Sequence, residues 1–404
     1  MAKQSLAVKI AKRHQMKRYQ IVESAFIEVH GEKPTLWVQA PGRVDLMGSH
    51  TDYNEGYVLT EAIDRSVWIA ARPRTDRQVR ICSMNIEGVG AFSLDEIVYD
   101  NDAPWTNYVR GVADVMHQEG YTLNGFDGVI HSTIPFGSGL SSSAALEAAA
   151  AVLFAALTDV EIDKVDIAKM CQRAENEFVG LNCGILDQYS SMMGEAGRAL
   201  LLDCRSITSE LRTLASDVLV MICDTNARRK LTGSEYSTRR ADCEKGARLL
   251  KVFYPQVKTL RDVTMTQFQA QRENLPEVIA RRCQFIIEEN QRVLDMAAAL
   301  ASGDRAAIKK LAAASFEGAR TLYEIVSPEM EAMMEAMMSA SGVIGARQAG
   351  AGFGGCMTAI IEAEVSSDFA DHTTRRYETL SGIGGEVFSV RASPGAGVMD
   401  FNAN

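Results

Sequence analysis

Hydrophobic and polar positions in the first third of the chain follow the short, alternating or clustered pattern of β-strands. Apolar-rich runs of strand length predict strands at Leu36–Ala40, Ser66–Arg72, Val79–Ser83 and Gly128–Thr133. The spacing then becomes helical, and it predicts helices at Ser142–Leu157 and Asp163–Phe178. This order of elements differs from a regular repeat of strand–helix–strand units.

The second half is richer in helical patterns. Two further strands are predicted at Ala199–Asp203 and Val218–Cys223, followed by helices at Ser234–Phe253, Glu277–Leu300, Arg305–Ala314 and Pro328–Ser339. The last quarter predicts strand, strand, helix and strand at Val343–Gln348, Cys356–Glu362, Ser367–Leu380 and Glu386–Val390. We therefore expect an α+β protein of two layered domains, 1–205 and 206–404.

Composition excludes several classes of protein. The 404 residues, 47% hydrophobic and 23% charged, are ordinary for a soluble globular chain, and a net charge of −10 offers no general attraction to nucleic acid or anionic lipid. No apolar run approaches the roughly 20 residues that span a bilayer. The eight cysteines are scattered without a Cys-x-x-Cys pair, which favours reduced thiols over disulfides or zinc. We expect a cytoplasmic protein that binds neither nucleic acid nor membrane.

A glycine- and serine-rich segment precedes the helix predicted at Ser142. Gly137 and Gly139 let the backbone approach a ligand, and Ser141, Ser142 and Ser143 offer hydroxyls beside the unpaired N–H groups of a helix N-terminus. Such a terminus attracts phosphate oxygens, so the segment predicts a nucleotide phosphate site. The alternative is a flexible loop that ends in an ordinary serine N-cap.

A second glycine-rich segment, 350–355, matches the Gly-x-Gly-x-x-Gly pattern of dinucleotide-binding proteins. That pattern requires a helix after the glycines, whereas Cys356–Ile361 is predicted as a strand. The chain also lacks the Gly-x-x-x-x-Gly-Lys-Ser/Thr pattern of a P-loop. Two interpretations remain, a loop that closes on a ligand and a plain tight turn.

The third motif, 40–53, brings Arg43, Asp45, His50 and Asp52 together in a short segment. With these three motifs in this order, the chain resembles the GHMP small-molecule kinases and, among them, the galactokinase family. The resemblance extends from about Ala40 to Phe401. It implies a two-domain GHMP kinase fold with mixed sheets and layered helices, and an active site between the domains. The sugar motif and the ATP phosphate loop would lie in 1–205, and the glycine-rich loop 350–355 in 206–404.

The resemblance implies a catalytic pair. Asp187, in the segment 183–188, would accept the proton of the sugar C1 hydroxyl, and Arg43 would neutralise charge on the transferring phosphoryl group. An adjacent arginine weakens an aspartate as a base, so positioning is an alternative role for Asp187. A buried ion pair between domains is the structural alternative for the two residues.

The resemblance also implies ligand contacts. Asp52 would bind vicinal sugar hydroxyls and His50 the sugar rim, and the full set of sugar-binding residues is Asp45, Ser49, His50, Asp52, Gly184 and Tyr236. The ATP-binding residues would be Gly137, Ser138, Gly139, Leu140, Ser141, Ser142, Ser143, Ala144, Trp105, Gly350 and Gly352. Trp105 could equally be a core residue. Ser143 and Glu175 would bind Mg²⁺, although Glu175 taken alone reads as a solvated helix carboxylate.

Two positions in the motif 40–53 depart from the family pattern. Asp45 stands where galactokinases have asparagine, and Ser49 stands where they have a glutamate that contacts the C6 hydroxyl of galactose. A site that loses this hydrogen-bond partner discriminates less between sugars that have the C6 hydroxyl and sugars that lack it. Phe316, where the family commonly has histidine, is a third departure, with no functional interpretation.

The resulting prediction is an ATP-dependent sugar 1-kinase, a phosphotransferase with an alcohol acceptor. It would convert galactose or a similar sugar to the sugar 1-phosphate and ADP. One alternative is a 1-kinase for a C6-variant sugar, such as L-arabinose, a 6-deoxy sugar or galacturonate, with the uronate ranked lower because Asp45 restores a negative charge. Others are a non-catalytic sugar- and ATP-binding regulator and a different GHMP enzyme. We expect a monomer or weak homo-oligomer.

Overall fold

The computed structural model describes residues 2–227 and 234–401 and is built around two β-sheets. The larger sheet has the order β12-β1-β2-β5-β3-β4, with β6 also pairing β2 and β7 pairing β6. Only β3 and β5 run parallel, so the sheet is mixed. Its strands are β1 (Leu36–Met47), β2 (Tyr57–Pro73), β3 (Gln78–Ser83), β4 (Val89–Ser93), β5 (Phe126–Ser132), β6 (Arg198–Asp203), β7 (Thr208–Thr213) and β12 (Gly397–Val398).

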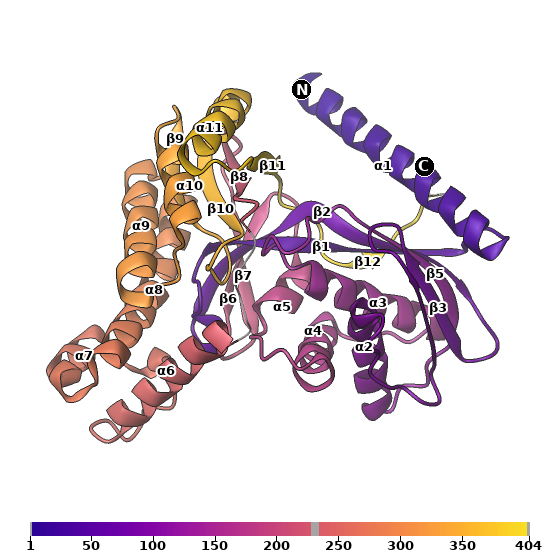
Figure 1. Cartoon of the computed structure of the whole chain (residues 1–404), viewed down its shortest axis with the longest axis horizontal. Coiled ribbons are helices and arrows are strands. Elements are labelled where there is room, and N and C mark those ends of the chain that lie inside the picture. The colour runs from indigo at the N-terminus through magenta and orange to yellow at the C-terminus, as the bar shows by residue number, and fades with distance from the viewer. Residues whose placement is uncertain (1, 228–233, 402–404) are drawn as a thin grey trace.

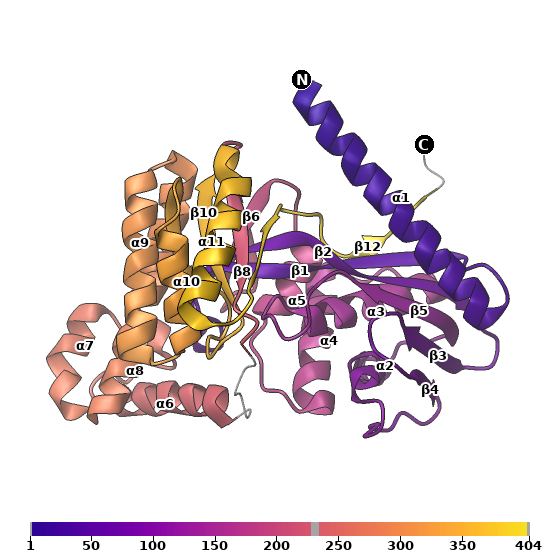
Figure 2. The ribbon, with the colours of Figure 1, turned by 45° about the horizontal axis from the view of Figure 1, so that its top comes forward.

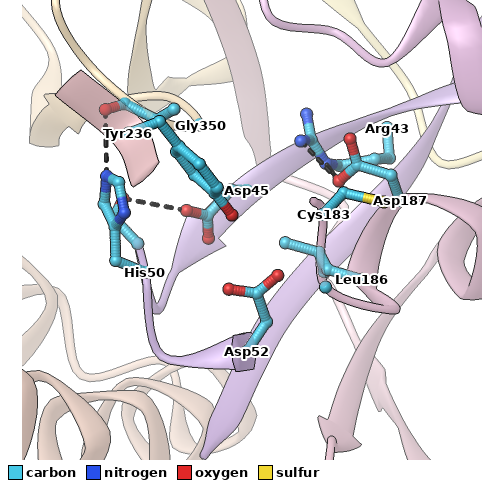
Figure 3. Close-up of a pocket in the computed structure, with 12 residues that line it drawn as sticks. Arg43, Asp45, His50, Asp52, Cys183, Leu186, Asp187, Tyr236 and Gly350 are labelled. Carbon is cyan, nitrogen blue, oxygen red and sulfur yellow. Dashed lines mark hydrogen bonds and ion pairs between the residues drawn. The ribbon is translucent and has the colours of Figure 1, made fainter. Parts of the chain in front are cut away.

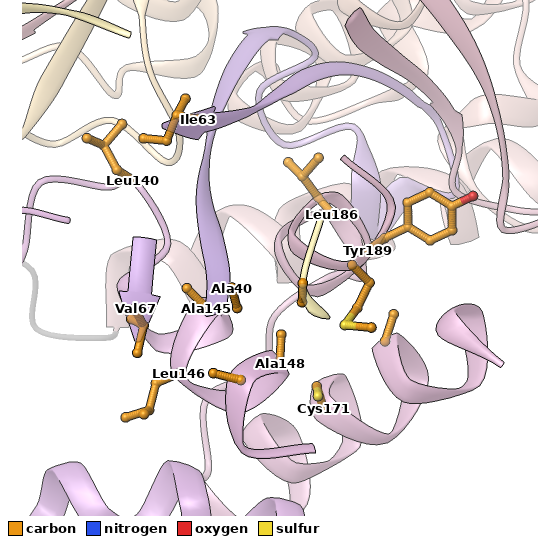
Figure 4. Close-up of a cluster of buried hydrophobic side chains, with 14 of the residues drawn as sticks. Ala40, Ile63, Val67, Leu140, Ala145, Leu146, Ala148, Cys171, Leu186 and Tyr189 are labelled. Carbon is orange, nitrogen blue, oxygen red and sulfur yellow. The ribbon is translucent and has the colours of Figure 1, made fainter. Parts of the chain in front are cut away.

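Helices cover both faces of this sheet (Figures 1 and 2). One face carries α2 (Asn107–Gln118), α3 (Ser142–Thr158), α4 (Lys164–Arg173) and α5 (Leu186–Met193), whereas α1 (Ala2–His30) crosses the other. The alanines in the N-terminal part of α3, Ala144, Ala145 and Ala148 to Ala151, are fully buried, and Figure 4 shows Ala145 facing Ala40 of β1. Small side chains bring this helix close to the sheet, which fixes its N-terminus beside β1.

The smaller sheet is antiparallel, in the order β11-β8-β10-β9. Its strands are β8 (Val218–Asp224), β9 (Val343–Gln348), β10 (Cys356–Glu362) and β11 (Glu386–Val390). The helices α10 (Pro328–Met338) and α11 (Ser366–Ser381) pack on one face, and α9 (Arg305–Gly318) packs on the other. Beyond α9 lie α8 (Glu277–Ser302), α6 (Ser234–Lys251) and α7 (Met265–Gln271).

Local sequence signals mark several helix ends. The hydroxyl of Ser327 accepts a hydrogen bond from the backbone of Met330, and Pro328 occupies the first turn of α10. Thr264 forms a capping box with Gln267 at the start of α7. Gly303 ends α8 with φ of +69°, a conformation that favours glycine.

The α+β class with mixed sheets and layered helices is confirmed. Several elements are longer than their pattern predicted: β1 continues through the sugar motif to Met47, and β2 begins at Tyr57. The predicted helix Asp163–Phe178 changes after Arg173 into a π-helical turn, η3 (Ala174–Val179). The helices α1, α2, α5 and α7 and the strands β4, β7 and β12 were not predicted.

The division at 205/206 stays a prediction, and residues 228–233, within its second part, lie outside the described residues. Two strands from beyond this division, β7 and β12, pair with β6 and β1 of the larger sheet. None of the helices in the described part of the chain is long and apolar enough to cross a membrane.

Candidate active site

A cavity of about 150 Å³ opens beside β1, the N-terminus of α5 and the loop 349–355 (Figure 3). All eight residues predicted as catalytic or sugar-binding line it, together with Gly350. Three more residues complete the lining and were not predicted as site residues: Cys183, Leu186 and Ala351. Residues from both halves of the sequence therefore meet at one site.

Arg43 and Asp187 form an ion pair at one end of the cavity. The guanidinium Nε and Nη2 of Arg43 lie 2.8 and 2.6 Å from Oδ1 of Asp187, and Nη1 donates to the carbonyl of Gly139 at 2.6 Å. The Arg43 side chain is 7% exposed, whereas Asp187 is 28% exposed. The pair therefore presents a carboxylate to the cavity, while its arginine is held against the glycine- and serine-rich loop 137–143, called the phosphate loop after its predicted role.

The phosphate loop is joined to this pair through Ser141. The Ser141 hydroxyl donates to Oδ2 of Asp187 at 2.5 Å and makes no capping bond to α3. Ser141 has φ of +61°, a left-handed conformation that is uncommon outside glycine. The expectation of an ordinary serine N-cap is therefore wrong, and the first amides of α3 have no side-chain cap from Ser141.

The two glycine-rich loops lie against each other. The amide of Cys356 donates to the carbonyl of Ser138 at 3.0 Å, and a Cβ on Gly350 would lie 3.4 Å from the carbonyl of Gly139. Gly352, with φ of +77°, lies over Ile325, where a Cβ would come within 2.6 Å of the backbone oxygen. Loop 349–355 is thus packed onto the phosphate loop, which a plain tight turn would not require.

Trp105 lies outside the cavity lining. It is partly buried, packs on the main hydrophobic core, and its indole N–H has no partner among the described residues. A role beside the nucleotide base stays a prediction.

Glu175 is the second residue of the π-helical turn η3 and is 6% exposed, so the alternative of a solvated helix carboxylate is wrong. Gln188 Nε2 donates to it at 2.6 Å, and the Cys183 thiol at 3.3 Å. Burial raises the pKa of Glu175, as does the nearby negative charge of Asp187. Glu147, fully buried and bonded to the same amide at 3.0 Å, adds a further acid. Among the described residues no group of three or more His, Cys, Asp or Glu side chains is arranged to hold a metal ion by itself, so Mg²⁺ binding at Glu175 stays a prediction.

Asp52 lies on the floor of the cavity against Gly184. A Cβ at position 184 would come within 1.9 Å of Asp52 Oδ2, so only glycine permits this approach. Burial raises the pKa of Asp52 to about 6, and the negative charge of Asp187 adds to the rise.

His50 is held by a chain of hydrogen bonds. Its Nε2 lies 2.9 Å from the carbonyl of Ala351, which can only accept, so Nε2 carries the proton. Nδ1 then accepts from Tyr53 at 2.8 Å, and Tyr53 contacts the hydroxyl of Tyr323 at 2.7 Å. Burial lowers the pKa of His50 to about 4, so the ring is neutral at pH 7.

Asp45 and Ser49 belong to a buried polar network that was not predicted. Arg347 of β9 donates to Ser49 Oγ at 2.8 Å and to Glu289 of α8 at 3.0 Å, and Ser49 donates to Asp45 Oδ2 at 3.0 Å. Burial raises the pKa of Asp45, opposed by the charges of Arg347 and Arg43. No local spacing could reveal this network, because Arg347 is 298 residues from Ser49.

Profiles of known families match three parts of the chain. Residues 24–73 match the galactokinase galactose-binding signature, residues 107–195 the GHMP kinases N-terminal domain, and residues 296–373 the GHMP kinases C-terminal domain. The first match contains the motif at 40–53, and the second contains the phosphate loop and the segment 183–188.

Curated relatives cover nearly the whole chain. A galactokinase of Roseiflexus sp. (strain RS-1) is 41% identical over 376 residues, which is 93% of this chain and 96% of that protein. A galactokinase of Chloroflexus aggregans is 39% identical over 361 residues, covering 89% and 93%.

Solved structures agree. Lactococcus lactis galactokinase, crystallised with galactose, superposes with a TM-score of 0.89 at 31% identity, covering 93% of this chain and 98% of that one. The mevalonate kinase of Methanococcus jannaschii superposes with a TM-score of 0.60 at 17% identity over 90% of this chain and 99% of that one, which shows a common fold alone.

Proposed function

Because the chain belongs to the galactokinase family of GHMP kinases and is an ATP-dependent sugar kinase, we propose that it phosphorylates the anomeric C1 hydroxyl of galactose. The products would be galactose 1-phosphate and ADP. The observation that carries this proposal is the joining of the Arg43–Asp187 pair to the phosphate loop through Ser141 and Gly139.

Asp187 orients the acceptor hydroxyl. Arg43 occupies Oδ1 and Ser141 bonds Oδ2, so the carboxylate is fixed in position and its remaining lone pairs face the cavity. With both oxygens already bonded, the carboxylate is set to orient the hydroxyl and to accept its proton late in the transfer. Arg43 also places positive charge where the transferring phosphoryl group gains negative charge.

ATP is the co-substrate, and its phosphates would bind over the phosphate loop. The start of α3 offers backbone N–H groups without a side-chain cap from Ser141, and a helix N-terminus favours anions. Ser143 and Glu175, which share a side-chain hydrogen bond, would hold Mg²⁺ together with the ATP phosphates. When bound, Mg²⁺ neutralises phosphate charge and helps align the transferring group.

The sugar would lie between Asp52 and His50, with Tyr236 beside them. Asp52 has its carboxylate on the cavity wall and accepts hydroxyl hydrogen bonds when ionised. The neutral His50 ring is fixed by the Ala351 and Tyr53 contacts, so its orientation costs no entropy when the sugar binds.

A second candidate function is phosphorylation of a galactose-like sugar that differs at C6. Ser49 supports it, because its hydroxyl is already engaged by Arg347 and Asp45 and extends less far than a glutamate. This candidate shares every catalytic step with the first, and the two differ only in which sugar gives the highest kcat/KM.

ADP release with ATP, Mg²⁺ and a sugar panel tests both. The panel holds galactose, L-arabinose, fucose, galacturonate and N-acetylgalactosamine, with Asp187→Ala as the control. Turnover of galactose and an anomeric phosphate in the product's NMR spectrum support the proposal. Binding of sugar and ATP without turnover of any sugar contradicts it and favours a regulator.

A further inference from the structure

The Asp45 carboxylate has one oxygen that the fold leaves without a partner. Asp45 is 1% exposed and lines the cavity, and Oδ1 has no hydrogen-bond partner among the described residues. A buried charged oxygen without a partner is costly, so one that lines a ligand cavity points to a partner supplied by the ligand.

The other oxygen of Asp45 is held in place by the protein. The Arg347 guanidinium donates to Ser49 Oγ, which leaves the serine proton free to go to Asp45 Oδ2 at 3.0 Å. Arg347 Nη1 also lies 3.5 Å from Oδ2 as an ion pair. Both interactions lower the pKa of Asp45 and so oppose the rise that its burial causes.

The charge of the cavity wall decides what kind of ligand group can meet Oδ1. Three carboxylates line the cavity, Asp45, Asp52 and Asp187, against one lining cation, Arg43, which is paired with Asp187. Arg347 is shared with Glu289 at 3.0 Å and lies behind Ser49. The wall around Asp45 and Asp52 is therefore an acceptor for hydroxyl donors and repels an anionic group.

We propose that Asp45, held by Ser49 and Arg347, is a specificity-determining residue that accepts a hydrogen bond from a sugar hydroxyl and excludes sugar acids. The ligand class is thus a neutral polyhydroxylated sugar. This inference rests on the proposed function and narrows its substrate. Ser49 is shorter than the glutamate of the family, but it does not open the site to uronates, because Asp45 supplies a carboxylate there.

Asp45→Asn tests the exclusion of anions. It keeps the size of the side chain and removes its charge, so kcat/KM for galacturonate relative to galactose should rise about tenfold or more. Asp64→Asn, on the neighbouring strand β2 and outside the cavity lining, is the matched control and should leave this ratio unchanged.

Asp45→Ala tests the hydrogen bond. Four deoxygalactoses, each lacking one hydroxyl other than C1, are compared with galactose in both enzymes. In the wild type, removing the sugar hydroxyl that bonds Asp45 should lower kcat/KM. In Asp45→Ala, removing the same hydroxyl should have no further effect, because its partner on the protein is already gone. The other deoxy sugars should show independent, multiplied effects.

The outcomes separate the two levels of the proposal. If the wild type turns over no sugar, the proposed function fails. If it turns over galactose but Asp45→Asn keeps the wild-type ratio of galacturonate to galactose, the exclusion of acids is overturned. If each deoxy sugar loses the same factor in kcat/KM, relative to galactose, in Asp45→Ala as in the wild type, the contact between Asp45 and a sugar hydroxyl is overturned. If Asp45→Ala does not fold, the same deoxy sugars are compared in Asp45→Asn, and the change in their kcat/KM losses measures the interaction between residue 45 and each hydroxyl.

Discussion

At one end of the cavity the Arg43–Asp187 pair leaves its carboxylate 28% exposed, whereas at the other end Asp45, Arg347 and Glu289 are 3% exposed or less. The first end is built from β1, α5 and the phosphate loop, all within the first 205 residues. The second joins β1 to α8 and β9 of the second half.

The two ends of the cavity have different proposed tasks, phosphoryl transfer at the first and sugar binding at the second, and these tasks place different demands on charged groups. A reacting carboxylate must stay accessible to substrate, so its removal should affect the reaction more than the fold. A buried network of charges has already lost its hydration, so breaking it should affect the fold as well as the sugar site. Four predictions test or refine this contrast, beginning with the largest expected effect.

Asp187→Ala should lower kcat by about 10²–10⁴-fold, the range typical for a residue that positions or accepts a proton in the transition state. Because the variant also leaves the buried Arg43 guanidinium without its carboxylate, thermal unfolding is measured to establish that the protein stays folded. ADP release measures kcat. An activity above a tenth of wild type would remove Asp187 from the reaction.

Glu289→Gln should lower the free energy of unfolding by about 3 kcal/mol, because Arg347 and Arg292 would lose their shared buried carboxylate. Urea unfolding measures the loss. The matched control is Glu288→Gln, which also removes a carboxylate bonded to Arg292 but from a side chain that is 30% exposed. Its cost should stay below about 1 kcal/mol. Equal costs for the two variants would contradict the contrast between buried and exposed charges.

Ser141→Ala should lower kcat by about tenfold, since a hydrogen bond to a charged group contributes about 1.5 kcal/mol or more. The variant removes the link between the phosphate loop and Asp187 Oδ2 while keeping Arg43 on Oδ1. Single-turnover rates measure it, with Ser142→Ala as the neighbouring control for general disturbance of the loop. If both serines matter equally for kcat, the Ser141–Asp187 bond has no special role.

The pH profile of kcat/KM for the sugar should fall as the pH drops below about 6, because the raised pKa of Asp52 makes this group protonate there. A protonated Asp52 loses acceptor capacity for sugar hydroxyls. The decline should approach tenfold per pH unit on the acid side. Asp52→Asn should give a lower but flatter profile, and an unchanged slope in that variant would assign the titration to another group.

Three local motifs were enough to predict the chemistry from the sequence. Glycines and serines before a helix, a compact charged segment and a second glycine loop each carry short-range signals, because turns and helix ends depend on neighbouring residues. The eight predicted catalytic and sugar-binding residues line one cavity. Their individual roles stay proposals.

Element boundaries were predicted less well, for a physical reason. The strand β1 continues through the charged motif because pairing with β2 satisfies its backbone, although the polar residues Arg43 and Asp45 interrupt the apolar pattern. The π-helical turn at Ala174 likewise buries Glu175 beside Gln188, whereas helical spacing alone made Glu175 a surface residue.

The sequence by itself determined the fold class, the family resemblance and the identity of nine of the twelve residues that line the cavity. Only the tertiary structure decided that Arg347 and Glu289 stand behind Ser49, and that Ser141 bonds Asp187 instead of capping its helix. Local patterns encode backbone conformation and burial, but a contact between residues some 300 positions apart depends on how β1, α8 and β9 pack together.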